Sequence, residues 1–290
     1  MKKNIGMVGI GMMGHGIASN ILKHGYPLTV LEHAGNQPLE TLKAAGLRTS
    51  TRAADVAAQS DIVILVLTGS PQVEAVLTGE GGVLEGLRPG SIVIDCSTAL
   101  PASTVRMAQA VEAAGSRFLD MPMTRTPKEA AEGRLNLLVG GDATLLEECR
   151  PLLSCFAENI VHAGPVGAGH GMKLLHNFVS LGTVALIAEA AACATHHGIA
   201  PEAFVDILAK GGGGGVALER LRPYLLAQDT SSLRFSVANA CKDLGYYNTM
   251  AGDAGSHQAI AASVLATLES AQRSKPEALM PELVSLLQSR

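Results

Sequence analysis

A lysine and an asparagine at the start of a long helical pattern are well suited to chemistry. Lys173 and Asn177 lie four positions apart in "GPVGAGHGMKLLHNFVSLG", so a helix places both on one face. A lysine ammonium is protonated at neutral pH and can donate a proton to a carbonyl oxygen. The asparagine could orient the lysine or hold a substrate hydroxyl. Taken alone, however, Lys173 is more typical of a surface lysine whose stem lies along apolar side chains.

The stretch "DMPMTRTPKEAAEGRL" at 120–135 holds a second candidate, Arg125 between two threonines. A guanidinium offers a fork of N–H donors that suits a carboxylate or a sulfonate. The alternative is an exposed arginine paired with Glu129 or Asp120, because exposed arginines are common. The residues alone leave both interpretations open.

The same stretch predicts a short helix. "TPKE" has the form of a capping box, with Thr126 at the N-cap, Pro127 at the first helical position and Glu129 at the third. We expect this helix to end at Gly133, and Thr126 to be structural.

Near the N-terminus, "NIGMVGIGMMGHGIASNILKHG" places Gly9, Gly11 and Gly14 between a predicted strand and a predicted helix. The first glycine permits a tight turn, the second lets the backbone approach a pyrophosphate, and the third allows close helix packing. Glu32 ends the next strand, where a carboxylate can bind ribose hydroxyls and repel a 2′-phosphate. NAD is therefore favoured, although NADP is not excluded because a protonated His33 could assist a phosphate.

Two later loops follow apolar strands at 61–67 and 91–95. Ligands of open α/β sheets bind beyond the carboxyl ends of the strands, so Ser97 and Thr98 are candidates for contact with the nicotinamide and the substrate. The alternative is that they start the helix entered at Pro101.

These residues need a sheet and a set of helices to position them. Up to about residue 163, short apolar runs alternate with helical patterns, which predicts an α/β domain with a doubly wound sheet over 1–163. After Gly164 strand-like runs vanish, which predicts an all-helical domain over 164–290, with "GGGGG" at 211–215 as a connection between helices. The predicted strands are 4–10, 28–32, 61–67, 91–97, 117–122, 135–140 and 159–164. The predicted helices of the second half are 170–196, 201–209, 216–227, 236–253, 256–273 and 281–288.

Composition excludes several classes of protein. Hydrophobic residues make up 47% and charged residues 17% of the chain, and the net charge is −4, so neither nucleic acid nor an anionic membrane is an expected partner. The longest apolar stretch, at 181–198, is interrupted by Glu189 and two histidines, so we expect no membrane span. Five cysteines without CxxC spacing favour neither disulfides nor a zinc site. We expect a cytosolic protein without a bound metal, with its cysteines as small core residues.

Four motifs in order resemble the β-hydroxyacid dehydrogenase family, which includes 3-hydroxyisobutyrate dehydrogenases, tartronate semialdehyde reductases and sulfolactaldehyde reductases. The glycine-rich start, "DMPMTRTPKEAAEGRL", "GAGHGMKLLHN" and "KDLGYY" are similar to its cofactor, substrate, catalytic and carboxy-terminal motifs, and they cover nearly the whole chain. The resemblance implies a Rossmann domain, a helical second domain, a long helix bridging the two, and an active site between them. It also implies a homodimer or homotetramer.

The resemblance assigns roles to particular residues. Lys173 would exchange a proton with the carbonyl oxygen while hydride passes to or from the nicotinamide, and Asn177 would fix the geometry. The expected substrate-binding residues are Thr98, Met123, Thr124, Arg125, Phe235 and Asp243. The expected cofactor-binding residues are Gly9, Gly11, Met12, Met13, Gly14, Glu32, His33, Leu67, Thr68, Ser97, Thr98 and Lys242.

The substrate motif departs from the usual family pattern. Thr124-Arg125-Thr126 stands where most members have Ser-Gly-Gly, whose glycines let backbone amides approach a carboxylate. Gly-Arg-Thr occurs in the family's sulfolactaldehyde reductases, where the arginine is associated with the sulfonate.

The sequence therefore predicts an NAD(H)-dependent enzyme that interconverts a small 3-hydroxy acid, or a hydroxy-sulfonate, with its semialdehyde. The expected substrate is small and anionic. Alternatives are an imine reductase, against which Lys173 argues, and a non-catalytic nucleotide-binding protein of the same fold.

Overall fold

The computed structural model describes residues 2–288, which divide into two compact units. The first unit ends at Lys173 and the second begins at Leu174, so the division falls inside one long helix. The predicted boundary after residue 163 lies before that helix. Each unit has its own hydrophobic core.

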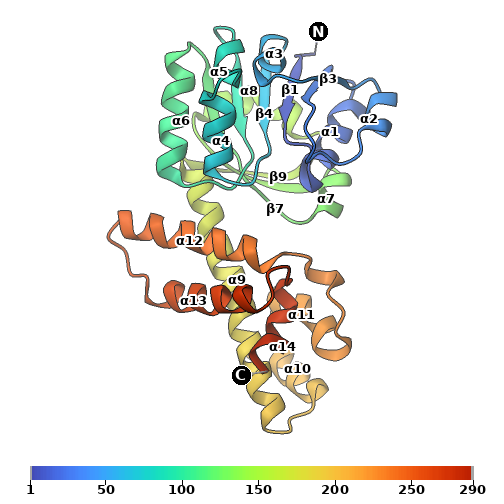
Figure 1. The fold of residues 1–290 in the computed structure, drawn as a ribbon, viewed down its shortest axis with the longest axis vertical. Coiled ribbons are helices and arrows are strands. Elements are labelled where there is room, and N and C mark those ends of the chain that lie inside the picture. The colour runs from blue at the N-terminus through green and yellow to red at the C-terminus, as the bar shows by residue number, and fades with distance from the viewer. Residues whose placement is uncertain (1, 289–290) are drawn as a thin grey trace. The chain divides into compact units, whose positions relative to one another are not determined.

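The first unit is an α/β structure built on one sheet (Figure 1). Its strands are β1 (Ile5–Val8), β2 (Leu28–Leu31), β3 (Arg48–Ser50), β4 (Ile62–Leu65), β5 (Ile92–Asp95), β6 (Arg117–Asp120), β7 (Met123–Thr124), β8 (Leu135–Gly140) and β9 (Ala157–Gly164). Its helices are α1 (Met12–Lys23), α2 (Glu40–Ala44), α3 (Ala53–Ala58), α4 (Ser70–Thr78), α5 (Val83–Gly86), α6 (Pro101–Ala113), α7 (Pro127–Ala131) and α8 (Ala143–Leu153).

Among the described residues the strand order is β3-β2-β1-β4-β5-β6-β8-β7, with β9 paired to β8. Strands β1 to β6 are parallel, which confirms the predicted doubly wound sheet. Strand β8 runs antiparallel to β6 and to β7. The chain between β6 and β8 holds only β7 and the short α7, too little for a parallel crossover. This antiparallel extension was not predicted, nor were the short strands β3 and β7.

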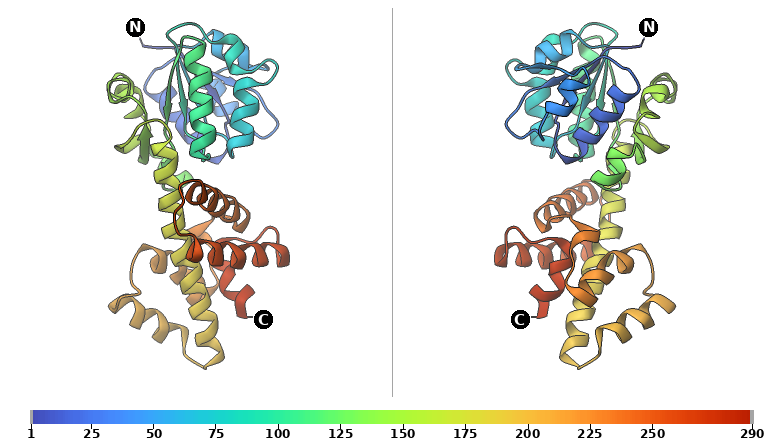
Figure 2. Two further views of the ribbon diagram at one scale, coloured as in Figure 1. Left: turned by 90° about the vertical axis from the view of Figure 1, so that its left-hand side faces the viewer. Right: turned by 90° about the vertical axis from the view of Figure 1, so that its right-hand side faces the viewer.

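Alternating side chains of the central strands bury into two separate cores. Met7 and Ile64 belong to the core beneath α1, α2, α7 and α8, whereas Val8 and Leu65 belong to the core beneath α3 to α6. Figure 2 shows these helix layers from opposite sides. Because every central strand is covered on both faces, its carboxyl end is the part left open for a ligand.

The second unit is all-helical, as predicted. It contains most of α9 (Ala168–His196), followed by α10 (Pro201–Lys210), α11 (Val216–Ala227), η1 (Ser231–Leu233), α12 (Val237–Asp253), α13 (Ala259–Ser274), η2 (Met280–Glu282) and α14 (Leu283–Gln288). Helices α12 and α13 pack side by side (Figure 1). The glycine run at 211–215 connects α10 to α11, as predicted.

Helix α9 is long and apolar enough to cross a bilayer by length and composition, which the sequence analysis did not anticipate. Its side chains Leu181, Val184 and Ala188 are nevertheless buried in the core of the second unit. A core helix of a folded domain accounts for the same composition.

The cysteines are all unpaired thiols. Cys96, Cys149 and Cys155 are buried, as predicted for small core residues. Cys193 is exposed, so that prediction is wrong for it, because its position on α9 faces away from the core.

Candidate active site

The loop between β1 and α1 uses its three glycines differently. Gly9 has a φ of +100°, and a Cβ there would overlap the carbonyl of Val66. Gly14 lies against the carbonyl of Gly9, so a side chain is excluded there too. Gly11, the N-cap of α1, is different because a Cβ on it would meet no protein atom within 4 Å. The fold requires the outer two glycines, while the middle one leaves room for an anion to approach the helix N-terminus.

Asn36, which the sequence analysis missed, ties this loop to the end of β2. Its Oδ1 accepts a hydrogen bond from Ile10 N at 3.3 Å, and its Nδ2 donates to Leu31 O at 2.9 Å. Glu32, which follows Leu31 in the chain, is exposed, and its Oε1 lies 3.3 Å from Lys43 Nζ. Asn36 therefore ties the chain just before Glu32 to the glycine loop.

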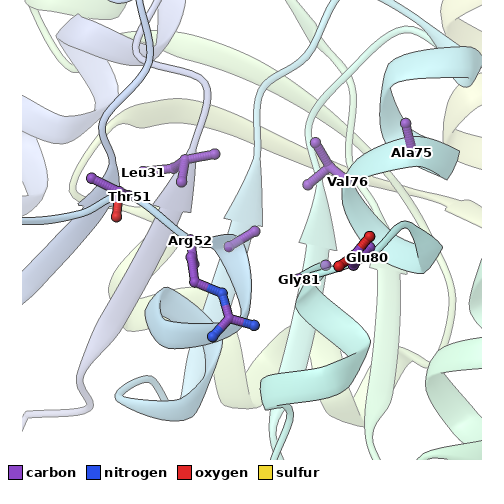
Figure 3. A pocket seen from close by; sticks show the side chains of 9 residues that line it. Leu31, Thr51, Arg52, Ala75, Val76, Glu80 and Gly81 are labelled. Carbon is purple, nitrogen blue, oxygen red and sulfur yellow. The ribbon is translucent and has the colours of Figure 1, made fainter.

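A hollow of about 470 Å³ lies next to the end of β2. Figure 3 shows Leu31, Thr51 and Arg52 on one side of it and Ala75 and Val76 of α4 on the other. Its lining mixes apolar side chains with polar ones such as Thr51, Arg52 and Glu80, a mixture that can hold a flat heteroaromatic ring and hydrogen-bond to its edge. No pattern in the sequence predicts this hollow, because its lining comes from segments far apart in the chain: the end of β2, residues 51–53, α4 and residues 80–82.

The loops after β4 and β5 are tied together by two serines. Ser97 is buried and its Oγ accepts from Leu67 N at 2.9 Å, while Ser70 Oγ accepts from Leu100 N at 2.8 Å. The N-cap of α6 is Leu100, so the alternative that Ser97 or Thr98 starts this helix is wrong. Thr98 is partly exposed. Of the other predicted cofactor residues, Met12 and Met13 lie on the first turn of α1, His33 follows β2, and Leu67 and Thr68 follow β4.

Arg125 adopts a φ of +83°, a left-handed conformation that favours glycine. It therefore keeps the backbone shape expected of the glycine that most family members carry at this position. Its guanidinium donates to the carbonyl of Arg134 and pairs with Glu158 on β9. The predicted partners of an exposed arginine, Glu129 and Asp120, are thus wrong, because the turn directs the side chain along the sheet edge.

Thr124 and Thr126, on either side of Arg125, have different structural roles. Thr124 is buried and its Oγ1 accepts from Asn136 Nδ2 at 3.0 Å, so its own hydrogen is available for a further acceptor. Met123, beside it, is also buried. Thr126 and Glu129 form the predicted capping box of α7, which confirms the structural role of Thr126.

Lys173 lies on the second turn of α9 and is partly buried. The start of this helix is fixed by Asp120, the last residue of β6, whose Oδ1 accepts from Gly167 N at 2.7 Å and whose Oδ2 accepts from His170 N at 2.8 Å. The lysine therefore follows directly from a helix start anchored to the carboxyl edge of the sheet.

In the second unit, three predicted residues come together. Asn177 Nδ2 donates to Asp243 Oδ2 at 2.6 Å, and Lys242 Nζ lies 3.1 Å from Asp243 Oδ1. This second contact has the distance of an ion pair without hydrogen-bond geometry. Phe235 lies two residues before α12 and packs against the core of this unit.

In the part of the chain that the structure describes, no group of three or more His, Cys, Asp or Glu side chains is arranged to hold a metal ion. The candidate donors are instead the backbone amides at the N-terminus of α1, the hydroxyl of Thr124 and the side chain of Lys173. Such groups bind anions and polarise carbonyl oxygens.

Comparisons with known proteins agree with this arrangement. Residues 4–164 match the family model described as the NAD-binding domain of 6-phosphogluconate dehydrogenase. Residues 167–284 match the model described as NAD-binding of NADP-dependent 3-hydroxyisobutyrate dehydrogenase.

Similar whole proteins point the same way. The NAD-dependent L-serine dehydrogenase of Pseudomonas aeruginosa is 36% identical over 222 residues, which cover 77% of this chain and 74% of that protein. The 3-sulfolactaldehyde reductase of Escherichia coli K12 is 32% identical over 241 residues, covering 83% and 80%. The structure of Mycobacterium tuberculosis 3-hydroxyisobutyrate dehydrogenase with L-serine superposes with a TM-score of 0.89 at 25% identity, covering 99% and 100%. The chain belongs to the β-hydroxyacid dehydrogenase family of NAD(P)-dependent oxidoreductases.

Proposed function

We propose that this protein interconverts a small 3-hydroxy acid with its semialdehyde, using NAD(H) in preference to NADP(H) and Lys173 as the proton donor and acceptor. The observation that carries the proposal is the anchored start of α9, which places a lysine one turn beyond the carboxyl ends of β5 and β6. That edge is where open α/β sheets bind ligands.

Lys173, Thr124 and Asn177 have different roles in the proposed reaction. In the reductive direction the Lys173 ammonium donates its proton to the carbonyl oxygen, and in the oxidative direction the neutral amine takes the proton back. The bound nicotinamide supplies or accepts the hydride. Thr124, whose oxygen already accepts from Asn136, donates its hydrogen to the substrate's anionic group. Asn177 is held by Asp243 and contributes its position on the face of α9 that carries Lys173.

The cofactor preference rests on Glu32. Its carboxylate lies exposed beside the glycine loop, where it accepts hydrogen bonds from ribose hydroxyls and repels a 2′-phosphate. The hollow beyond Leu31 then takes the adenine ring. Free thiols fit a reducing compartment, so we expect the enzyme to work in the cytosol, as a homodimer or homotetramer.

A substrate panel tests the proposal. It contains L-serine, 3-hydroxyisobutyrate, a hydroxy-sulfonate and a hydroxy-dicarboxylate, each assayed with NAD and NADP by absorbance. We expect turnover of a monocarboxylic 3-hydroxy acid with NAD, and loss of at least about 1,000-fold in kcat for Lys173→Ala with NADH binding retained. Tight NADH binding without turnover of any substrate would favour a nucleotide sensor. Wild-type activity in Lys173→Ala would exclude the lysine as proton donor.

A further inference from the structure

A buried histidine stands at the start of α9, three residues before Lys173. His170 has no exposed surface. Its Nε2 lies 3.1 Å from Ser97 O, and because a carbonyl can only accept, Nε2 carries a hydrogen. Its Nδ1 lies 2.7 Å from Thr104 Oγ1 on α6. The ring therefore links the catalytic helix to the loop after β5 and to a neighbouring helix.

Two buried carboxylates flank this ring. Asp95 and Asp120 are the last residues of β5 and β6 and are register partners across these parallel strands. Asp95 Oδ2 lies 3.9 Å from His170 Nε2, and Asp120 Oδ2 lies 3.8 Å from Nδ1. Burial raises the pKa of Asp95, and the attraction of His170 opposes that rise.

The threonine hydroxyl can pair with the ring in either direction. Thr104 Oγ1 lies 3.0 Å from Leu100 O, so it can donate its hydrogen there and accept from Nδ1, or donate to Nδ1 instead. In both arrangements the ring stands between two carboxylates. Asp95 Oδ2 has no hydrogen-bond partner among residues 2–288, so the ring is the nearest compensation for its charge.

Glycines allow the start of α9 to pack closely against Asp120 and the neighbouring strands. A Cβ on Gly169 would overlap the carbonyl oxygens of Leu138 and Asp120, and a Cβ on Gly140 would overlap the Asp120 carboxylate. Gly167, which donates to Asp120, has a φ of +90°. The first turn of α9 is thus fixed both by hydrogen bonds and by direct backbone packing.

Buried ionic groups of this kind seldom add stability, since well-packed apolar residues of similar volume do as well or better. What they supply here is geometry. We propose that His170, together with Asp95 and Asp120, is a positioning residue that sets the rotation and register of α9 and hence the location of Lys173 Nζ at the sheet edge. This inference rests on the proposed role of Lys173.

Variants of His170 test it. His170→Leu removes both ring hydrogen bonds, and we expect kcat to fall about 100-fold, the size of effect produced by a misplacement of about 1 Å. The KM for NADH should stay within about threefold, because the glycine loop is untouched. In His170→Gln the amide can still donate to Ser97 O, so we expect recovery of kcat to within about 10-fold of wild type.

A control and an activity-independent measurement complete the experiment. His162 also contacts a backbone carbonyl, Gly141 O at 2.8 Å, but lies on β9 outside the cluster, so His162→Leu should leave kcat unchanged. Amide exchange at 166–173 should accelerate in His170→Leu and not in His162→Leu.

The outcomes distinguish the positioning role of His170 from the proposed function of Lys173. Suppose that Lys173→Ala is inactive. The positioning role is then overturned if folded His170→Leu keeps the wild-type kcat, or if kcat of His170→Gln is as low as that of His170→Leu. If Lys173→Ala is active, the proposed function has failed. Unchanged exchange at 166–173 in His170→Leu overturns the positioning role whichever residue donates the proton.

Discussion

Two buried aspartates, one in each unit, are held in different ways. Asp120 in the first unit accepts two backbone N–H groups, at 2.7 and 2.8 Å, and glycine backbones enclose it. Asp243 in the second unit has side-chain partners: Asn177 Nδ2 at 2.6 Å, and the Lys242 ammonium at 3.1 Å without hydrogen-bond geometry. Their exposures are nearly the same, 0% and 3%, so burial alone does not distinguish them.

The kind of partner decides whether an aspartate is part of the folded scaffold or can exchange its partner for a ligand. Backbone amides cannot leave Asp120 unless the helix start moves, so its carboxylate belongs to the fold. Side chains can rotate away from Asp243 to meet a ligand, at the cost of one hydrogen bond and one ion pair. We therefore expect the same substitution to affect folding at one site and ligand response at the other.

Asp120→Asn carries the largest expected effect. An amide has one acceptor oxygen, so its NH₂ group would face one of the two backbone N–H donors. We expect a loss of about 3 kcal/mol in the free energy of unfolding, measured by urea denaturation, because a buried donor loses its partner and the charge that His170 faces is removed. A loss below about 0.5 kcal/mol would show that Asp120 is not needed for the stability of the fold.

Glycine-to-alanine pairs extend the contrast to the backbone. Gly11→Ala adds a Cβ where no protein atom lies within 4 Å, so stability should be unchanged or slightly higher, while NADH affinity falls at least about 10-fold because the pyrophosphate needs that space. Isothermal titration measures the affinity and thermal melting the stability.

Gly169→Ala is the matched case. Its Cβ would overlap backbone oxygens, so the melting temperature should fall markedly. Equal melting temperatures for the two alanine variants would contradict the division between space reserved for a ligand and space used by the fold.

Asp243→Asn should change stability by less than about 1 kcal/mol, because the single hydrogen bond from Asn177 can be kept by the amide oxygen. Its effect should fall on kcat or on cofactor dissociation, since Lys242 loses its ion-pair partner. Stopped-flow NADH release, compared with urea denaturation of the same variant, decides this. Destabilisation equal to that of Asp120→Asn would place both aspartates in the scaffold.

The sequence predicted those parts of the molecule that depend on local pattern. Buried strands such as β4 and β5, the glycine loop and the capping box at Thr126 carry their own signals. The short β3 and β7 do not, because two or three residues are too few to show a strand pattern and form a strand only through a neighbouring one. The histidine cluster left one trace: "IVID" and "RFLD" are apolar strands that each end in aspartate. The contacts of Asn36 and Arg125 are tertiary, so the residue types alone could not indicate them.

At the surface of the first unit, Glu148 tests how little an exposed side-chain network contributes. Arg117 and Lys3 lower the pKa of its carboxyl to about 2. The stability from this network is therefore complete above the ordinary carboxyl pKa and is lost as the pH falls toward 2. Because these side chains are 37 to 45% exposed, Glu148→Gln should cost less than about 1 kcal/mol at pH 6, and the difference from wild type should vanish near pH 2. A constant difference across this range would rule out the ion pairs as its cause.

Arg125→Gly has the smallest expected effect on stability, because its stabilising and destabilising effects nearly cancel. Glycine removes left-handed strain of about 1 kcal/mol at a φ of +83°. It also loses the half-exposed ion pair with Glu158 and gains freedom in the unfolded chain, which together cost a similar amount. Unfolding free energy should thus stay within about 1 kcal/mol of wild type.

If the Arg125 guanidinium remains with Glu158 during turnover, the KM of Arg125→Gly for carboxylate and sulfonate substrates is also unchanged. A rise in KM for the sulfonate alone would show instead that Arg125 exchanges Glu158 for the substrate, and would group it with Asp243 among the residues whose partners change on binding.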